Sequence, residues 1–273
     1  MEWVFFFLGI GLLAGFLAGL FGVGGGAVLV PLLMFAFRYL EFDEKTLAHL
    51  AVGTSFATIV FTSLGSLWGH HRQGNVNWPL WRALALPLAI GVTLGSWIAS
   101  QFSSLWLAPF IGLFFAFVAL QMGFAWLPVS RGGLPGAAGI RGVGVTIGAV
   151  SSFVGIGGGS LTVPWLKYCN RAVHEAVGTS AACGLPIAAF GALSYWWFGQ
   201  TGGVEVPIGL NWGFVYLPAF FAIVATSVPA AFLGARLAAL FSPQLLSRLF
   251  ALLLFTVASY TLLSSLLRLY TLL

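Results

Sequence analysis

Hydrophobic residues run along this chain in long blocks, which charged residues, prolines and glycines separate from one another. A helix that crosses a bilayer needs about 20 predominantly apolar residues, and most of the blocks reach that length. The pattern therefore predicts an all-α integral membrane protein with about ten helical segments. Their expected positions are residues 3–21, 27–38, 46–70, 80–100, 104–127, 140–154, 160–168, 172–198, 212–239 and 243–270.

Two of the predicted segments are too short to cross a membrane. Residues 27–38 span about 18 Å at the α-helical rise per residue, and residues 160–168 span less. Each segment follows a glycine cluster, Gly22–Gly26 in the first case and Gly155–Gly159 in the second. Irregular backbone at membrane depth is tolerated where it is buried in protein or lines a wet cavity. We therefore expect two re-entrant hairpins, each with a long helix, a glycine bend and a short helix.

The glycine clusters belong to a larger internal repeat. Each is followed by a second shared motif, His49-Leu-Ala-Val-Gly-Thr-Ser55 and His174-Glu-Ala-Val-Gly-Thr-Ser180. A duplication with helix breaks at matching positions is typical of secondary transporters. The sequence predicts a first repeat at residues 1–127, a cytoplasmic linker rich in glycine and proline at residues 128–139, and a second repeat at residues 140–273.

The composition excludes a soluble protein, because the chain is 60% hydrophobic and only 6% charged. Soluble domains carry about a quarter charged residues, so most of this surface must face lipid. The formal net charge of +5 does not indicate nucleic-acid binding, because the basic residues are scattered singly instead of clustered on one face. Cys169 and Cys183 fit no metal-binding or redox spacing. No metal, cofactor or nucleic-acid partner is expected.

The distribution of basic residues predicts the topology, since cytoplasmic loops carry an excess of Lys and Arg. If each glycine cluster reverses the chain, each half has five elements and one side collects eight bases against three. If the clusters are only kinks, the split is six against five. The eight bases are Arg72, Arg82, Arg131, Arg141, Lys167, Arg171, Arg236 and Arg248. We therefore expect both termini outside the cell and, because five is odd, a second repeat inverted relative to the first.

The glycine clusters are the main candidates for substrate binding. Glycine allows close approach and positive φ, and a helix that starts at such a bend leaves N–H groups and about half a positive charge at its N-terminus. Because the halves are inverted, the two bends should meet near the midplane and face one anion. The candidate residues are Gly24, Gly25, Gly26, Ala27, Gly157, Gly158, Gly159 and Ser160. The alternative is that the glycines only permit tight helix packing.

Hydroxyl groups in the second motif are candidates for the same site. Thr54, Ser55, Thr179 and Ser180 fall at depths similar to those of the glycine bends, at about 1.5 Å per helical residue. A hydroxyl can donate a hydrogen bond to an oxyanion without adding a buried charge. The alternative is that each hydroxyl bonds back to the carbonyl four residues earlier in its own helix.

Three titratable residues near helix starts are candidates for proton coupling or gating. His49 and His174 open the two copies of the second motif, and Glu175 has no counterpart because Leu50 occupies the matching position. The alternative for the histidines is a helix-end role, bonded to water or to a carbonyl.

The glycine segments leading to Pro31 and Pro164, with the twin Val-Gly-Thr-Ser segments and the overall length, resemble the TauE/SafE family of sulfite and organosulfur anion exporters. The resemblance covers essentially the whole chain. It implies a polytopic inner-membrane permease, prokaryotic in most cases, for sulfite, thiosulfate, sulfoacetate or a related small anion. The motifs do not choose among these substrates.

The expected function is secondary transport of a small sulfur-containing anion across the cytoplasmic membrane by alternating access. A passive anion channel and a carboxylate permease are alternatives. An integral-membrane enzyme is disfavoured because it needs a convergent acid–base or metal constellation, and Glu175 is the only carboxylate expected to lie within a helix. The substrate, the direction of flux, the coupling ion and the oligomeric state are left open, with a homodimer as one arrangement.

Overall fold

The computed structural model describes residues 2–21, 26–124, 132–200, 204, 206–207, 209–238 and 243–272. Almost all of them are helical, which confirms the all-α fold. The helices are α1 (Glu2–Phe21), α2 (Gly26–Tyr39), α3 (Leu47–Arg72), α4 (Trp78–Gln101), α5 (Ser104–Gly123), α6 (Ala137–Val154), α7 (Gly159–Tyr168), α8 (Val173–Gln200), α9 (Leu217–Ala238) and α10 (Pro243–Leu272).

Seven of the helices in the described part of the chain are long and apolar enough to cross a membrane. Many of their large apolar side chains point outward, among them Phe117 and Leu252. An exposed apolar surface of this extent would be covered only by lipid. The chain is therefore a multi-pass membrane protein.

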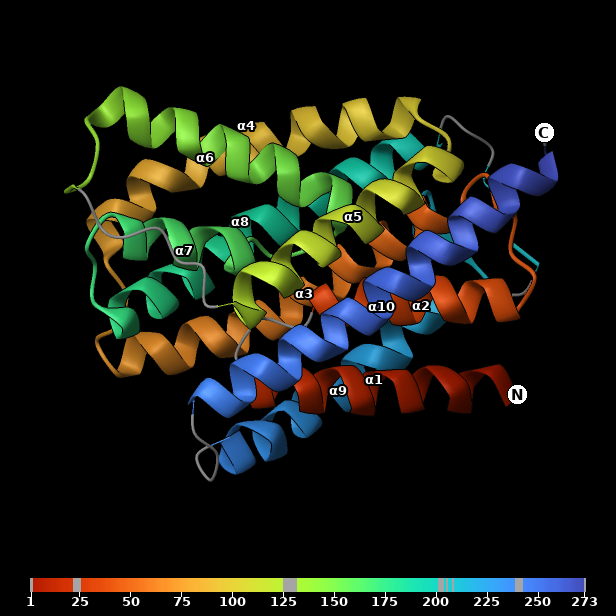
Figure 1. Cartoon of the computed structure of the whole chain (residues 1–273), viewed down its shortest axis with the longest axis horizontal. Coiled ribbons are helices and arrows are strands. Elements are labelled where there is room, and N and C mark those ends of the chain that lie inside the picture. The colour runs from red at the N-terminus through yellow and green to blue at the C-terminus, as the bar shows by residue number, and fades with distance from the viewer. Residues whose placement is uncertain are drawn as a thin grey trace.

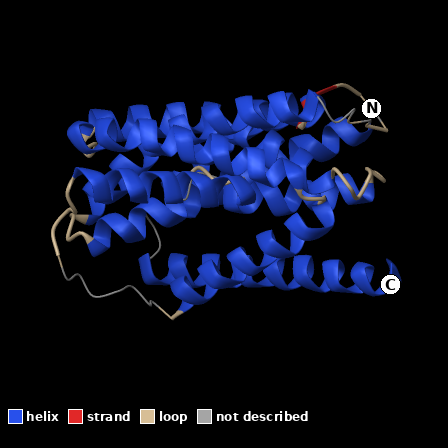
Figure 2. Cartoon of the chain, turned by 90° about the horizontal axis from the view of Figure 1, so that it is seen from above, coloured by secondary structure: helices blue, strands red, loops and turns tan. Residues whose placement is uncertain are grey.

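The helices lie side by side along one direction, and the loops gather at the two ends (Figures 1 and 2). Both termini lie at the same end, which we call the terminal end (Figure 1). Helices α1 and α6, which open the two halves, run in opposite directions, α1 away from the terminal end and α6 toward it. Each is followed by a short helix, α2 or α7, that runs back the way the chain came.

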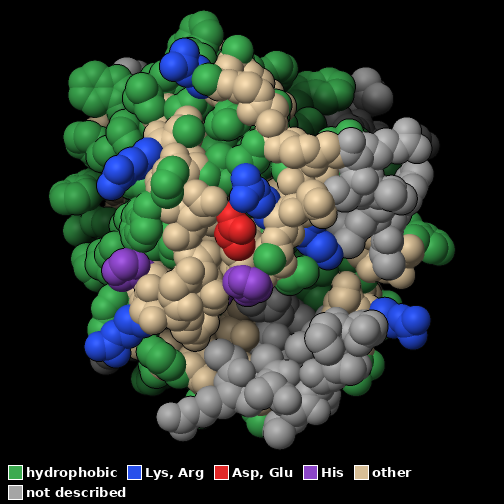
Figure 3. All heavy atoms as spheres, turned by 90° about the vertical axis from the view of Figure 1, so that its left-hand side faces the viewer, with side chains coloured by type: hydrophobic (Ala, Val, Ile, Leu, Met, Phe, Trp, Pro, Cys, Tyr) green, Lys and Arg blue, Asp and Glu red, His purple; other side chains and the backbone are tan. Residues whose placement is uncertain are grey.

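The end opposite the termini, which we call the basic end, carries most of the described basic residues. Figure 3 views this end and shows basic side chains and histidines spread over it, around a small acidic patch. Among the described residues, those in or next to its loops are Arg72, Arg82, Arg141, Lys167, Arg171 and Arg248. Arg38 and Lys45 lie at the terminal end, between α2 and α3. The described basic residues therefore gather mainly at the end opposite the termini.

Packing between the halves is reciprocal. Helix α1 packs along α9, and α4 packs along α6, so the first element of each half lies on the fourth element of the other. The third elements, α3 and α8, pack together, and so do the fifth elements, α5 and α10. Glycines allow the closest crossings, since a Cβ on Gly15 would collide with the backbone of Ser227 and one on Gly91 with that of Val145.

One predicted boundary is wrong. The segment before α9 was expected to be helical from residue 212, but Asn211–Trp212 (β1) and Val215–Tyr216 (β2) form a two-stranded antiparallel ribbon. The cause is Gly213, which has a φ of 55°, a left-handed conformation that reverses the chain and that glycine adopts at little cost. Helix α9 therefore begins at Leu217.

Candidate functional site

The start of α2 meets the bend between α6 and α7 inside the bundle. A Cβ added to Gly26, at the start of α2, would lie 2.8 Å from the carbonyl oxygen of Gly155 and 3.0 Å from the Cα of Ile156. The backbones of the two halves are therefore in direct contact at this point. Gly24 and Gly25 lie outside the described residues, so their role stays a prediction.

The bend between α6 and α7 depends on two left-handed glycines. Gly155 ends α6 with a φ of 72°, and Gly158 precedes α7 with a φ of 75°. Other residues adopt this conformation at a cost of roughly 1–2 kcal/mol. In the described part of the chain, the N–H groups of Gly157, Gly158, Gly159 and Ser160 make no backbone hydrogen bond. Within the described chain, the bend therefore presents N–H donors without a backbone acceptor at the positive end of the α7 dipole.

A cavity of about 350 Å³ extends from this bend to the basic end. Its walls come from α3, α5, α7, α8 and the start of α10. The lining residues in the described part of the chain are Ile59, Thr62, Ser63, Ser66, His70, Val118, Gln121, Met122, Gly157, Gly159, Ser160, Val163, Pro164, Lys167, Val177, Ser180, Ala181, Gly184 and Ser247. The lining mixes apolar side chains with hydroxyl, amide and basic groups.

The inner end of the cavity is rich in unused hydrogen-bond donors. The hydroxyls of Ser160 and Ser180 are buried, and neither has a hydrogen-bond partner in the described chain. Ser180 is only 2% exposed. Buried polar groups are almost always paired, so two orphan hydroxyls in the lining of one cavity indicate a place for an acceptor. No carboxylate lines the cavity in the described chain, so these donors face no competing negative charge.

The threonines of the second motif do not line the cavity. Thr179 Oγ1 accepts a hydrogen bond from the N–H of Asn77 at 3.0 Å, and Thr54 Oγ1 accepts one from the N–H of Tyr216 at 2.9 Å. Asn77 directly precedes α4 and Tyr216 directly precedes α9. Each threonine therefore holds the entrance to a helix of the opposite half.

The neighbouring glycines complete this connection between the halves. A Cβ on Gly178 would collide with the carbonyl of Asn75, and one on Gly53 with the carbonyl of Phe214. Each glycine lets a loop of the other half lie directly on the helix, where the adjacent threonine binds it. The Gly-Thr pair is thus a docking element in both repeats, and this arrangement explains its duplication.

The two serines of the motif have different surroundings. Ser55 Oγ donates to the carbonyl oxygen of Gly155 at 2.8 Å and so fixes the bend of the other half. Ser180, its counterpart, has no partner and lines the cavity. Neither serine donates to a carbonyl of its own helix, which was the alternative considered for these hydroxyls. Thr58 does so, because its Oγ1 donates to the carbonyl oxygen of Thr54 at 2.7 Å.

His49 is buried and fully bonded. Its Nε2 lies 3.0 Å from the carbonyl oxygen of Ala99, and its Nδ1 lies 2.9 Å from Ser104 Oγ, which also accepts the N–H of Ala48 at 3.1 Å. A neutral ring with its proton on Nε2 satisfies all three contacts, with the Ser104 hydroxyl donating to Nδ1. This geometry matches the alternative considered for His49, a histidine near a helix start that is bonded to a carbonyl.

His174 and Glu175 lie at the basic end and outside the cavity lining. His174 is exposed. Glu175 Oε1 accepts a hydrogen bond from Asn77 Nδ2 at 2.7 Å and lies 3.6 Å from Arg171 Nη1. Because Asn77 also caps α4 by accepting the N–H of Leu80 at 3.0 Å, Glu175 supports the same loop that Thr179 binds.

The sequence interpretation missed Lys167, which lines the cavity in the last turn of α7. A signal was present, because Lys167 follows Pro164 by three residues in the second repeat. The residue three after Pro31 in the first repeat is Met34. A lysine in place of a methionine is unusual inside an apolar hairpin. This difference between the repeats indicates that part of α7 faces water.

Comparison with known proteins agrees with this description. The family model for the sulfite exporter TauE/SafE matches residues 7–261. The chain belongs to the sulfite exporter TauE/SafE family. No solved structure matches the chain.

Several curated relatives of this TauE/SafE member cover nearly its full length. A probable membrane transporter protein of Haemophilus influenzae is 36% identical over 251 residues, covering 91% of this chain and 94% of the relative. One of Xylella fastidiosa is 31% identical, covering 93% and 92%. One of Methanocaldococcus jannaschii is 26% identical, covering 86% of each. The chain is accordingly a membrane transporter and not an enzyme.

Proposed function

We propose that this chain carries a small sulfur-containing anion, such as sulfite, thiosulfate or an organosulfonate, across the prokaryotic cytoplasmic membrane by alternating access. The observation that carries the proposal is a cavity that ends on the N-terminus of α7 and is also lined by Ser180 of α8, whose buried hydroxyl has no partner in the described chain. Membership of a family described as sulfite exporters supports the choice of substrate.

The proposed binding site combines backbone and hydroxyl donors. The N–H groups of Gly157 to Ser160 and the hydroxyls of Ser160 and Ser180 surround the inner end of the cavity. Hydrogen bonds from such donors to an anion are charge-assisted and about twice as strong as neutral ones. Gly24–Ala27 of the other hairpin are proposed to approach the anion from the opposite side, because Gly26 contacts the second bend.

Thr54, Ser55 and Thr179 are proposed to act indirectly. Their hydroxyls hold the loops and the bend that shape the site, and they release these groups when the halves move. Ser55 and Ser180 occupy equivalent positions, so in the opposite-facing state we expect Ser180 to be bonded and Ser55 to face the substrate.

A carrier accounts for the cavity better than a channel. The lining residues that lie nearest the surface, His70, Lys167 and Ser247, all belong to the basic end. A channel needs a continuous path, whereas a carrier opens to one side at a time. The reciprocal packing of α1 on α9 and α4 on α6 supports two inverted repeats that rock against each other. By the positive-inside rule, the basic end faces the cytoplasm and both termini lie outside.

Counterflow in proteoliposomes tests the proposal. Purified protein is reconstituted into vesicles loaded with unlabelled thiosulfate, and entry of ³⁵S-thiosulfate and ³⁵S-sulfite is followed. We expect saturable uptake driven by exchange. Uptake proportional to concentration without exchange would indicate a channel, and no uptake of any small anion by folded protein would overturn the proposal. Light scattering of the purified complex tests the predicted homodimer.

A further inference from the structure

One charged residue lines the cavity in the described chain. Among the residues that line it, only Lys167 carries a permanent charge. Lys167 lies in the last turn of α7, and its side chain is partly exposed. The rise of the helix places it about 12 Å from Gly159 at the inner end, so it marks the mouth of the cavity.

Neighbouring bases at this end have other partners. Arg171 pairs with Glu175 at 3.6 Å, and the guanidinium of Arg72 lies 4.2 Å above the ring of Trp68. For Lys167, the described part of the chain shows no ion pair. Its ammonium group is therefore available to a ligand in the cavity.

The helix dipole makes this position important. Helix α7 is 10 residues long, with its positive end at the bend and about half a negative charge at its C-terminus. That negative end lies at the mouth, where it repels an arriving anion. A lysine in the last turn places a full positive charge beside that end and offsets the partial negative charge there.

The first repeat shows that the hairpin itself does not need this charge. Met34 takes the matching position three residues after Pro31, and it is 2% exposed within the apolar core. The C-terminus of α7 is capped by Cys169, whose backbone N–H donates to the carbonyl oxygens of Trp165 and Lys167. This cap does not involve the Lys167 side chain. The lysine therefore is not required for the packing of the hairpin.

We propose that Lys167 is the charge-selecting residue of the cavity, which holds the arriving anion at the mouth and favours dianions over monoanions. The inference rests on the proposed anion site at the start of α7. Coulomb attraction to one ammonium group scales with the charge of the anion, so a dianion gains about twice as much as a monoanion of similar size.

Binding to purified protein in detergent tests the inference, with thiosulfate as the dianion and methanesulfonate as the monoanion. We compare wild type, K167Q, K167M and K167R with R141Q, which removes a base from an exposed position at the same end. At low ionic strength, K167Q and K167M should raise the thiosulfate Kd about five- to tenfold and the methanesulfonate Kd about two- to threefold. K167R should remain close to wild type.

Salt separates a charge effect from a structural one, because screening weakens partly exposed charges. The difference between wild type and K167Q should shrink severalfold at high ionic strength. Equal losses for both anions, losses that salt does not change, or a K167Q indistinguishable from R141Q would overturn the inference. Failure of wild type to bind either anion would instead overturn the proposed function. K167M, which copies Met34, provides a second reading if K167Q is poorly expressed.

Discussion

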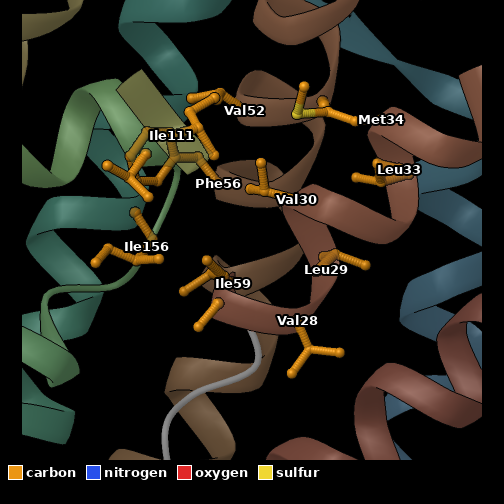
Figure 4. Close-up of a cluster of buried hydrophobic side chains, with 14 of the residues drawn as sticks. Val28, Leu29, Val30, Leu33, Met34, Val52, Phe56, Ile59, Ile111 and Ile156 are labelled. Carbon is orange, nitrogen blue, oxygen red and sulfur yellow. The ribbon is translucent and has the colours of Figure 1, made fainter. Parts of the chain in front are cut away.

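The two short helices, α2 and α7, begin with the same motif and lie in opposite surroundings. Around the start of α2, the side chains of Val28, Leu29 and Val30 are buried in an apolar cluster, which Ile59 and Ile156 join from the facing elements (Figure 4). The start of α7 instead lines a cavity of about 350 Å³. Two helices that begin with similar sequences therefore differ: the start of α2 is packed closed by apolar side chains, and the start of α7 is open to a cavity.

This difference shows how the site is divided between the halves. Ile59 both packs with the α2 cluster and lines the cavity (Figure 4), so one side chain separates the closed region from the open one. If the halves rock against each other as proposed, this difference between α2 and α7 belongs to one state of the transport cycle. The opposite-facing state would open a cavity beside α2 and close the one beside α7.

The largest effect is expected from a substitution that disturbs the glycine bend between α6 and α7, which lines the cavity. Gly158 has a φ of 75°, and a Cβ there would collide with Ile187. We expect G158A to reduce counterflow at least tenfold, because strain and displacement together disturb the N–H donors. Gly65, around which a Cβ meets no atom, provides the control, and G65A should transport normally. A fully active G158A would contradict this use of the bend.

The next largest difference is expected between alanine substitutions of the two serines, Ser180 and Ser55. S180A removes a donor from the open site, and we expect the thiosulfate Kd to rise about tenfold, as for a hydrogen bond to a charged group. S55A frees the Gly155 carbonyl and should slow exchange while leaving the Kd within about twofold. Titration and counterflow of both variants measure these effects. Equal behaviour of the two variants would remove the distinction between open and closed sides.

The threonines should behave alike, because both halves use them in the same way. T54V and T179V each leave a loop N–H without its acceptor, at a cost of about 1–3 kcal/mol. We expect both to lower the Tm by a few degrees and to leave the ratio of thiosulfate to methanesulfonate affinity unchanged. Thermal unfolding and titration test this. A changed selectivity for either variant would place its threonine in the binding site.

The smallest effect is expected at Glu175. E175Q keeps an oxygen for Asn77 and loses only a partly exposed ion pair with Arg171, which is worth little. Because Glu175 lies outside the cavity lining, we expect transport within about twofold of wild type. Counterflow with and without an imposed pH gradient tests its predicted part in proton coupling. Loss of gradient-driven transport alone would assign the coupling proton to this carboxylate.

Most of the fold was predictable from the sequence because lipid imposes simple rules. Apolar length set the helices, and the glycine clusters with their short following segments identified the hairpins. The ribbon before α9 was missed because one left-handed glycine, Gly213, outweighed an apolar segment that also suited a helix.

The site was predictable only in part. The Gly157–Ser160 bend and Ser180 follow from the repeated motifs, and the structure brings them together. The hydrogen bonds of Thr54 and Thr179 did not follow, because their partners, Tyr216 and Asn77, lie in loops of the other half. Such contacts depend on tertiary packing, which a local pattern does not contain.

The central claim is that an anion binds where the N-terminus of α7 faces Ser180. A cryo-electron microscopy or crystal structure of the protein with selenate, an electron-dense tetrahedral dianion similar in shape to thiosulfate, tests it most directly. We predict density at the inner end of the cavity, within hydrogen-bond distance of Ser180 Oγ and the N–H groups of Gly159 and Ser160. Selenate bound elsewhere, with this end of the cavity filled by side chains, would contradict the account.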